Sequence, residues 1–130
     1  MIYNLVKYLV DGNPGLSYCA NGFKENSPDD CTSVNEGQGI EQSWYNREDI
    51  TIQVVSRALK GTTARINNKS SYNLIKKKYG LTLPEVTVES VVYPAVKTWA
   101  IRPVTTPTYI GDDENGRPMY TFNVEITLQN

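Results

Sequence analysis

Residues 120–128 read Tyr-Thr-Phe-Asn-Val-Glu-Ile-Thr-Leu, with apolar and polar side chains in strict alternation. Successive side chains of a β-strand point to opposite faces, so this period predicts a strand with one buried face. The other face, which carries Thr121, Asn123, Glu125 and Thr127, must then meet water or another subunit. This segment is the clearest structural signal in the chain.

The residues just before this strand predict a turn. Asn115-Gly116 is a strong hairpin signal, because both residue types tolerate the positive φ of tight hairpin turns. The acidic run Asp112 to Glu114 also raises the question of a calcium loop. Gly111 stands where such a loop needs its first acidic residue, and Phe122 stands where it needs a bidentate glutamate. We therefore expect a polar turn and no metal site.

A second strand and a helix are predicted in the middle of the chain. Ile50, Ile52 and Val54 alternate with polar residues, which is typical of a half-buried strand. Residues 64–79 suit a helix capped by Thr62 or Thr63, with Tyr72, Ile75 and Tyr79 on one face. Lys76 to Lys78 would lie in its last turn before Gly80, where cations suit the helix dipole.

The first twelve residues predict an amphipathic helix. Ile2, Leu5, Val6, Leu9 and Val10 share one stripe, and Asn4, Lys7 and Asp11 are expected to face away from it. Short strands are expected at 16–23 and 31–34, an exposed loop at 35–42, and longer strands at 86–93 and 96–104. Pro94 and Pro103 should lie at strand ends or edges. The fold class is α+β, a single domain over residues 1–130 with an antiparallel sheet flanked by an N-terminal and a central helix.

Composition limits the function. The chain has 130 residues, 39% of them apolar and 21% charged, with a formal net charge of −1 and no histidine. The lack of histidine removes the commonest general base and excludes a Ser-His-Asp or Cys-His site within this chain. We expect no enzyme, no cofactor and no metal. Without a long apolar run or a signal-peptide pattern, we expect no membrane association and the cytosol as the default compartment. Cys19 and Cys31 are expected to be reduced, packed thiols.

Aromatic residues with a polar tip are abundant. Nine tyrosines and two tryptophans accompany only two phenylalanines, and such residues are enriched in protein interfaces. Trp44 and Tyr45 lie in a polar stretch and are the expected exposed pair. Gly37-Gln38-Gly39 lacks the remaining residues of a phosphate-binding loop. The Lys76 to Lys78 run, with Arg65 and Lys69, leaves nucleic-acid binding open as an alternative to a solvated helix end.

Three segments in series resemble one known family. They are Asp49-Ile-Thr-Ile-Gln-Val-Val-Ser-Arg57, the helix expected to end at Tyr79-Gly80, and Pro107-Thr-Tyr-Ile-Gly111-Asp-Asp-Glu-Asn-Gly-Arg117 before the final strand. This order is similar to the tail terminator proteins of tailed bacteriophages, also labelled tail completion or minor capsid proteins. The sequence departs from the family pattern at Gly61–Lys69 and at Leu16–Asn26, which are more polar.

The resemblance implies a structural virion protein. Such proteins close into a hexameric ring on the head-proximal end of the tail tube, stop its growth and dock the head connector in the neck. DNA passes through the lumen without specific binding, and assembly takes place in the cytoplasm of the bacterial host. The partners implied are other copies of the chain, the tail tube protein and the connector protein.

The interface residues expected from this hypothesis lie in two segments. One is the Asp112–Arg117 hairpin and the other is the Gln38–Arg47 loop, which we expect to face a neighbouring subunit or the tube. The candidate residues are Trp44, Tyr45, Arg47, Asp112, Asp113, Glu114 and Arg117. Two alternatives remain: another neck component such as a stopper or head-completion protein, or a small domain that binds single-stranded nucleic acid by stacking on Tyr and Trp.

Overall fold

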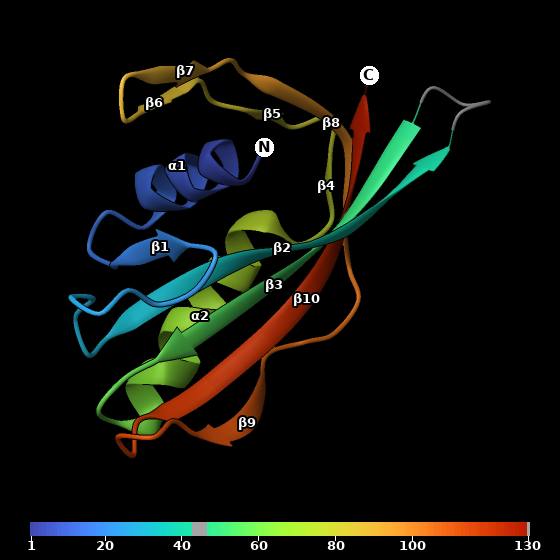
Figure 1. The fold of residues 1–130 in the computed structure, drawn as a ribbon. Coiled ribbons are helices and arrows are strands. Elements are labelled where there is room, and N and C mark those ends of the chain that lie inside the picture. Colours follow the sequence, from blue (N-terminus) through green and yellow to red (C-terminus); the bar gives the residue numbers. More distant parts are fainter. Residues whose placement is uncertain (43–46, 130) are drawn as a thin grey trace.

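The computed structural model describes residues 1–42 and 47–129 and shows an α+β fold with two helices beside a mostly antiparallel sheet (Figure 1). The helices are α1 (Ile2–Gly12) and α2 (Gly61–Ile75). The long strands are β2 (Cys31–Gln42), β3 (Arg47–Arg57), β8 (Val96–Pro103) and β10 (Pro118–Gln129). The short ones are β1 (Tyr18–Ala20), β4 (Lys78–Tyr79), β5 (Thr82–Leu83), β6 (Val86–Val88), β7 (Val91–Tyr93) and β9 (Thr108–Asp112). This arrangement confirms the predicted fold class.

The final strand lies in the middle of the main sheet. The strand order is β1-β2-β3-β10-β8-β4, with β9 also paired to β10 and β5 to β8, while β6 and β7 form a separate hairpin. All of these pairs are antiparallel except β1 with β2. The alternation predicted for β10 is confirmed, because Phe122, Val124 and Ile126 are fully buried while Asn123 and Glu125 are only half-buried. Burying each such side chain contributes about 1.5–3 kcal/mol.

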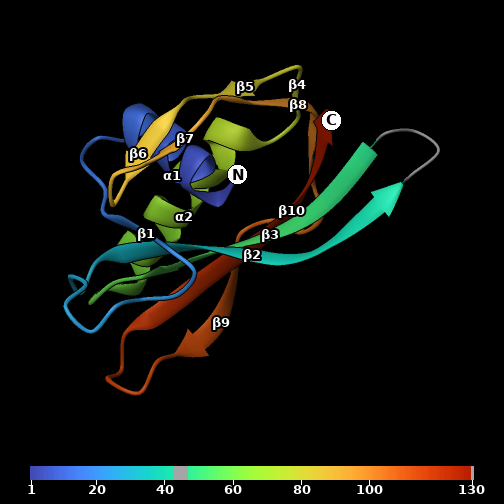
Figure 2. The same cartoon turned by 45° about the horizontal axis from the view of Figure 1, so that its top comes forward.

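Both helices cover the same face of the sheet, as two views show (Figures 1 and 2). Leu5 and Leu9 of α1 and Ile75 of α2 join Ile52 and Phe122 of the strands in one hydrophobic core. The opposite face of the sheet has no helix over it within the described residues. The polar positions of β3 and β10 point to that uncovered face.

The N-terminal helix is confirmed, but the expected orientation of Asn4 is wrong. Asn4 is 1% exposed, and its side-chain amide donates hydrogen bonds to the carbonyls of Pro84 (3.0 Å), Tyr93 (3.2 Å) and Pro94 (2.9 Å). These carbonyls flank the β6–β7 hairpin, which therefore folds back over α1. A polar side chain can be buried at this position because its donors are satisfied by backbone acceptors.

The central helix begins and ends earlier in the sequence than predicted. It begins at Gly61 after Lys60, with no side-chain cap from Thr62 or Thr63, and it ends at Ile75. Lys77 adopts φ 52°, and Lys78 and Tyr79 then pair with Ala100 and Ile101 of β8. The three lysines therefore do not occupy a last helical turn, because the open edge of β8 offers backbone hydrogen bonds that a longer helix would forgo.

Two further predictions were wrong. The expected loop at 35–42 is the second half of β2, paired with β3 across a register shift between Glu36 and Gly39. The expected strand at 86–93 is the β6–β7 hairpin, whose turn residues Glu89 and Ser90 have φ of 50° and 67°. Positive φ at both turn positions is typical of Asn-Gly, so this sequence gives no sign of the turn.

The thiols of Cys19 and Cys31 are free, and their sulfur atoms lie 3.8 Å apart. Cys31 is buried and Cys19 is half-buried. Pro103 ends β8 and Pro94 lies between β7 and β8, as their missing N–H donors predict.

Candidate functional site

The turn between β9 and β10 is organised by one carboxylate. Asp113 accepts hydrogen bonds from the backbone N–H groups of Asn115 and Arg117, both at 2.9 Å, and from Nε of Arg117 at 2.7 Å. Gly111 and Gly116 adopt φ of 109° and 76°, which their lack of a Cβ permits. The hairpin predicted from Asn115-Gly116 is confirmed, and Asp113 fixes the shape of its turn.

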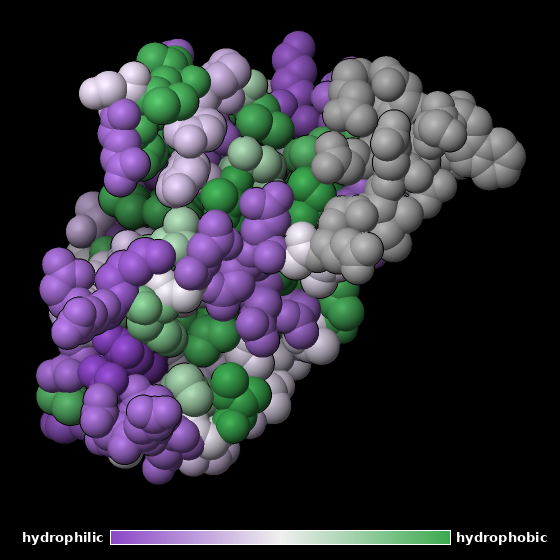
Figure 3. All heavy atoms as spheres, in the orientation of Figure 1, coloured by the Kyte–Doolittle hydropathy of each residue, from purple (hydrophilic) through white to green (hydrophobic). Residues whose placement is uncertain are grey.

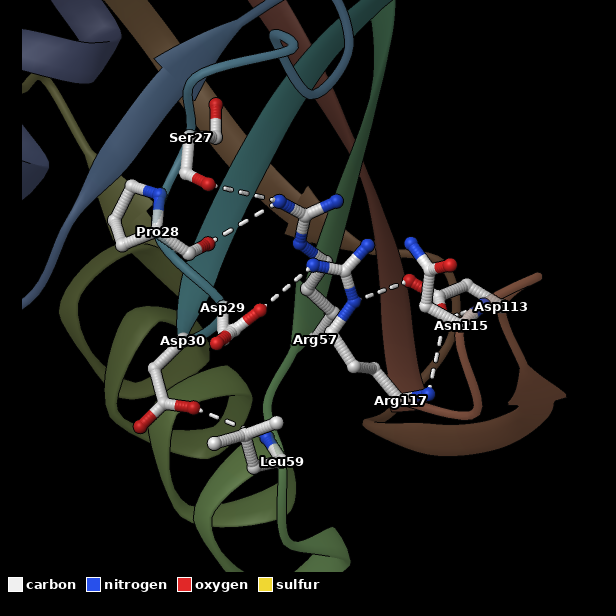
Figure 4. Close-up of polar contacts among 9 residues, drawn as sticks. All are labelled: Ser27, Pro28, Asp29, Asp30, Arg57, Leu59, Asp113, Asn115 and Arg117. Atoms are coloured by element: carbon white, nitrogen blue, oxygen red, sulfur yellow. Dashed lines mark hydrogen bonds and ion pairs between the residues drawn. The ribbon is translucent and has the colours of Figure 1, made fainter.

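Arg117 joins this turn to a distant loop. Its Nη1 lies 3.0 Å from Oδ1 of Asp29, while its Nε bonds Asp113 (Figure 4). The hydrogen bond to Asp113 is the main cause that raises the pKa of Arg117; burial opposes it, and Asp29 adds to it. Burial by itself would raise the pKa of Asp113, but the bonds from Arg117 and Asn115 outweigh it and lower that pKa. Both groups therefore stay charged through the neutral range.

A second arginine holds the same loop from the end of β3. Arg57 is 7% exposed, and its Nη2 donates to the carbonyls of Pro28 (3.1 Å) and Ser27 (3.4 Å) (Figure 4). Its guanidinium carbon lies 4.2 Å from the centroid of the Phe23 ring, a cation–π contact. Arg57 thus holds the loop before β2 against the end of β3.

We call the surface formed by loop 24–30 and turn 112–117 the acidic corner. Its exposed carboxylates are those of Glu25, Asp29, Asp30, Asp112 and Glu114. Asp112 accepts a hydrogen bond of 2.8 Å from the Tyr109 hydroxyl, and this bond is the main cause that raises the pKa of Tyr109. Asp30 accepts one of 3.1 Å from the backbone N–H of Leu59, just before α2. The framework of the corner is therefore held by hydrogen bonds, and most of its exposed charged side chains are negative.

An open hollow of about 490 Å³ lies at the corner, lined by Phe23, Arg57, Asp113, Glu114, Asn115 and Arg117. Its cations are already held, Arg57 by carbonyl groups and Arg117 by carboxylates. Among the described residues, no three His, Cys, Asp or Glu side chains are grouped to hold a metal ion. The arrangement suits recognition by a complementary surface.

The structure brings together only part of the predicted interface. Asp112, Asp113, Glu114 and Arg117 share the acidic corner, whereas Trp44 and Tyr45 lie outside the described residues. Arg47 begins β3 and pairs through its backbone with Gln42 and Gln129. Arg47 and Arg57 are the two ends of one strand, so Arg47 lies about 30 Å along it from the end that carries the acidic corner.

Sequence reasoning missed Phe23, Asp29 and Arg57. The Pro28-Asp29-Asp30 turn was a readable signal of an acidic loop, but nothing local pairs it with Arg117, 88 positions away. Arg57, at the end of an apolar strand, was the other readable sign. An arginine that is buried there needs hydrogen-bond partners from elsewhere in the fold.

Residues 6–130 match the family described as bacteriophage tail terminator protein. This match covers nearly the whole chain, including α2, the acidic corner and β10. The chain belongs to the bacteriophage tail terminator family.

Family membership makes the protein a structural component of a phage tail and confirms the resemblance inferred from the sequence. As a tail terminator, it interacts with other tail and head components. No curated protein matches the sequence. In the described part of this tail terminator, no helix is long and apolar enough to cross a membrane.

Proposed function

We propose that the protein caps the head-proximal end of a phage tail tube as a hexameric ring, ends tube growth and docks the head connector at the neck. The observation that carries this proposal is the family match over residues 6–130. The ring would assemble in the cytoplasm of the bacterial host and remain in the virion.

Open sheet edges support ring assembly. Within the described residues, β9 pairs only with β10, and β1 covers β2 only from Thr32 to Val34. The rest of each outer edge carries backbone N–H and C=O groups without a strand beside them, which favours association with another chain. Because these edges lie on opposite sides of one sheet, a contact that joins unlike surfaces can repeat around a ring.

The uncovered face of the sheet supports a channel for DNA. Hydrophilic residues gather on it where β2, β3 and β10 lie side by side (Figure 3). Asn35, Gln53 and Asn123 occupy paired positions of these three strands. Arg102 on this face is held by Glu125 and Thr127. With Arg102 neutralised in this way, the described part of the face suits a lumen along which DNA must move without being gripped.

The interface residues proposed for the ring and the tube are those of two segments. The Asp112–Arg117 turn presents the acidic corner, and the second segment is Gln38–Arg47, in which Trp44 and Tyr45 lie outside the described residues. We assign both to contacts with a neighbouring subunit or with the tube.

Native mass spectrometry and negative-stain electron microscopy of the purified protein test this function. We expect six-fold rings, either alone or after addition of tail tubes, with density at one end of each tube. A strict monomer that binds neither tube nor connector contradicts the proposal. Binding to the connector end alone would instead indicate a stopper protein, and tight, salt-dependent binding of single-stranded DNA would indicate a nucleic-acid-binding domain.

A further inference from the structure

The charges of this protein are unevenly distributed along the chain. Residues 50–84 contain no Asp or Glu, although the whole chain has a formal net charge of −1. The cations of this segment are Arg57, Lys60, Arg65, Lys69, Lys76, Lys77 and Lys78. The middle of the chain is therefore strongly basic, and the rest of the chain carries a compensating negative excess.

Several of these cations gather on a groove beside α2. Arg65, Lys69 and Lys76 line it together with Tyr72 and Asn73, and the link between β8 and β9 closes its other side at 106–107. The groove encloses about 280 Å³. We call it the basic groove.

The basic groove lies where the sheet edge is interrupted. Pairing of β8 with β10 stops at Val124, and pairing of β9 with β10 begins at Thr121. Between them, the carbonyl of Asn123 accepts hydrogen bonds from the backbone of Val104 and Thr105, so the link bends away from a regular strand. This interruption leaves room beside Tyr72. The ring of Tyr72 packs edge-on against that of the buried Phe122, with the two ring centroids 5.2 Å apart.

The cations of the groove have no anionic partner. Among the described residues, neither Arg65, Lys69 nor Lys76 forms an ion pair, whereas Arg102 and Arg117 do. Lys76 instead lies 5.5 Å from the centroid of the Tyr72 ring. Three unpaired cations around one groove favour an anionic ligand, because they repel one another until it binds.

An apolar residue accompanies these charges. Ile66 is 63% exposed on the same stripe of α2 as Arg65 and Lys69. Next to the acidic corner, Ile110 and Tyr109 of β9 are 48% and 52% exposed. The two surfaces therefore match in both respects, with opposite charge and an exposed apolar residue on each.

We propose that the basic groove of one copy receives the acidic corner of a second copy, with Asp112 and Glu114 facing Arg65 and Lys69. This proposal rests on the proposed function and names the contact that would build its ring. The two surfaces share no residue, so each copy can give its corner to one neighbour and its groove to another. A protein ligand is favoured over nucleic acid because every copy of the chain supplies the matching acidic surface in equal amount.

Charge reversal of the full chain tests this contact. One variant carries Arg65→Glu and Lys69→Glu, and the other carries Asp112→Lys and Glu114→Lys; all four side chains are exposed. Size-exclusion chromatography with light scattering and native mass spectrometry measure the oligomer at low salt. We expect each variant alone to associate at least about tenfold more weakly than the unaltered chain. An equimolar mixture of the two should recover the oligomer, because each groove again meets a corner of opposite charge.

Two controls make the outcome decisive. Reversal of Lys7 and Lys97, exposed cations that do not line the groove, should leave association unchanged. If the variant with Arg65→Glu and Lys69→Glu folds poorly by circular dichroism, the milder pair Arg65→Gln and Lys69→Gln replaces it. This pair should also weaken association.

The outcomes separate this proposal from the proposed function. Rings that persist in both reversed variants, or losses that mixing does not recover, overturn the groove–corner contact and leave the tail terminator function standing. Rings that persist while the groove variant loses binding to a fluorescent single-stranded DNA overturn it in favour of a nucleic-acid site. An unaltered chain that forms no ring even with tail tubes overturns the proposed function itself.

Discussion

Arg117 and Asp29 are 88 positions apart in the sequence, and their side chains meet at 3.0 Å at one end of the sheet. The same guanidinium also bonds Asp113 within its own turn. One side chain therefore sets the position of two acidic segments relative to each other. Substitution of Arg117 tests whether this bridge holds the acidic corner together.

Arg117→Ala should loosen loop 24–30, because Asp29 then has no cation to bind and Asp113 keeps only backbone donors. We expect hydrogen exchange of the loop amides to accelerate severalfold, with little change in β10. Arg117→Lys keeps the positive charge but lacks the several N–H donors of the guanidinium. Its rate of loop exchange should therefore lie between those of the unaltered chain and of Arg117→Ala. Arg65→Ala, which removes an exposed arginine elsewhere, should leave the loop unaffected. Unchanged exchange in Arg117→Ala would contradict the bridging role.

Asp113 should contribute to stability in a pH-dependent way. Its pKa is lowered in the folded protein, so the folded state favours the carboxylate. The contribution is complete above the ordinary pKa of 3.8 and is lost as the pH falls through the folded pKa. Asp113→Asn should therefore be less stable than the unaltered chain at pH 7, and the difference should shrink below pH 3.8. Urea unfolding at several pH values measures this difference, and a gap that is constant with pH argues against it.

Asn4→Ala should destabilise the protein by about 2 kcal/mol, because the backbone carbonyls of Pro84, Tyr93 and Pro94 lose the donor that the buried Asn4 amide supplies. The loss should appear as a lower urea midpoint, together with faster exchange in the β6–β7 hairpin that Asn4 holds over α1. Lys7→Ala, on the exposed side of the same helix, is the matched control and should change stability by less than about 0.5 kcal/mol. Equal effects of the two substitutions would rule out the buried anchor.

Gly37→Ala should destabilise the protein by about 1–3 kcal/mol, because a Cβ at this position would lie 2.9 Å from the backbone oxygen of Thr51. Gly15→Ala is the control, since a Cβ there meets nothing within 4 Å. Urea unfolding should separate the two variants clearly. If Gly37→Ala is as stable as Gly15→Ala, β2 does not approach β3 as closely at this point as the structure indicates.

Cys31 should react slowly with alkylating reagents. Burial, reinforced by the neighbouring Cys19, raises the pKa of its thiol to about 11. At pH 8 only about one thiol in a thousand would then be ionised, so iodoacetamide should modify Cys31 far more slowly than an exposed thiol. Mass spectrometry of a Cys19→Ser variant isolates this reaction. A rate that levels off near pH 9 would show an unperturbed thiol.

The same shift predicts a loss of stability in alkali. The folded state holds the Cys31 proton more tightly than the unfolded chain, so this contribution is complete below the ordinary pKa of 9.0. It falls away as the pH rises from there through about 11. Cys31→Ala should remove this component from the pH profile of unfolding.

Local patterns were sufficient for several elements of the fold. The alternation in 120–128 predicted β10, Asn115-Gly116 predicted the turn before it, and the apolar stripe of residues 2–10 predicted α1. Each signal depends on the spacing of residues within one segment. The family resemblance also came from such local segments taken in order, and the match over residues 6–130 confirmed it.

The acidic corner was predicted in part. Asp112, Asp113, Glu114 and Arg117 were recognised as a charged turn, whereas Arg57, Phe23 and Asp29 were not connected with it. Their contacts join segments that only the sheet brings together, since Cys31 and Met119 both pair with Arg57 at the end of β3.

The sequence by itself therefore determined the elements whose burial pattern is written in a few consecutive residues, and the family to which the chain belongs. Tertiary structure decided that Asn4 is buried, that α2 ends at Ile75, and that residues 35–42 extend a strand. In each case a distant backbone supplied the hydrogen-bond partners, and a hydrogen bond formed away from water outweighs the local preference of the segment that makes it.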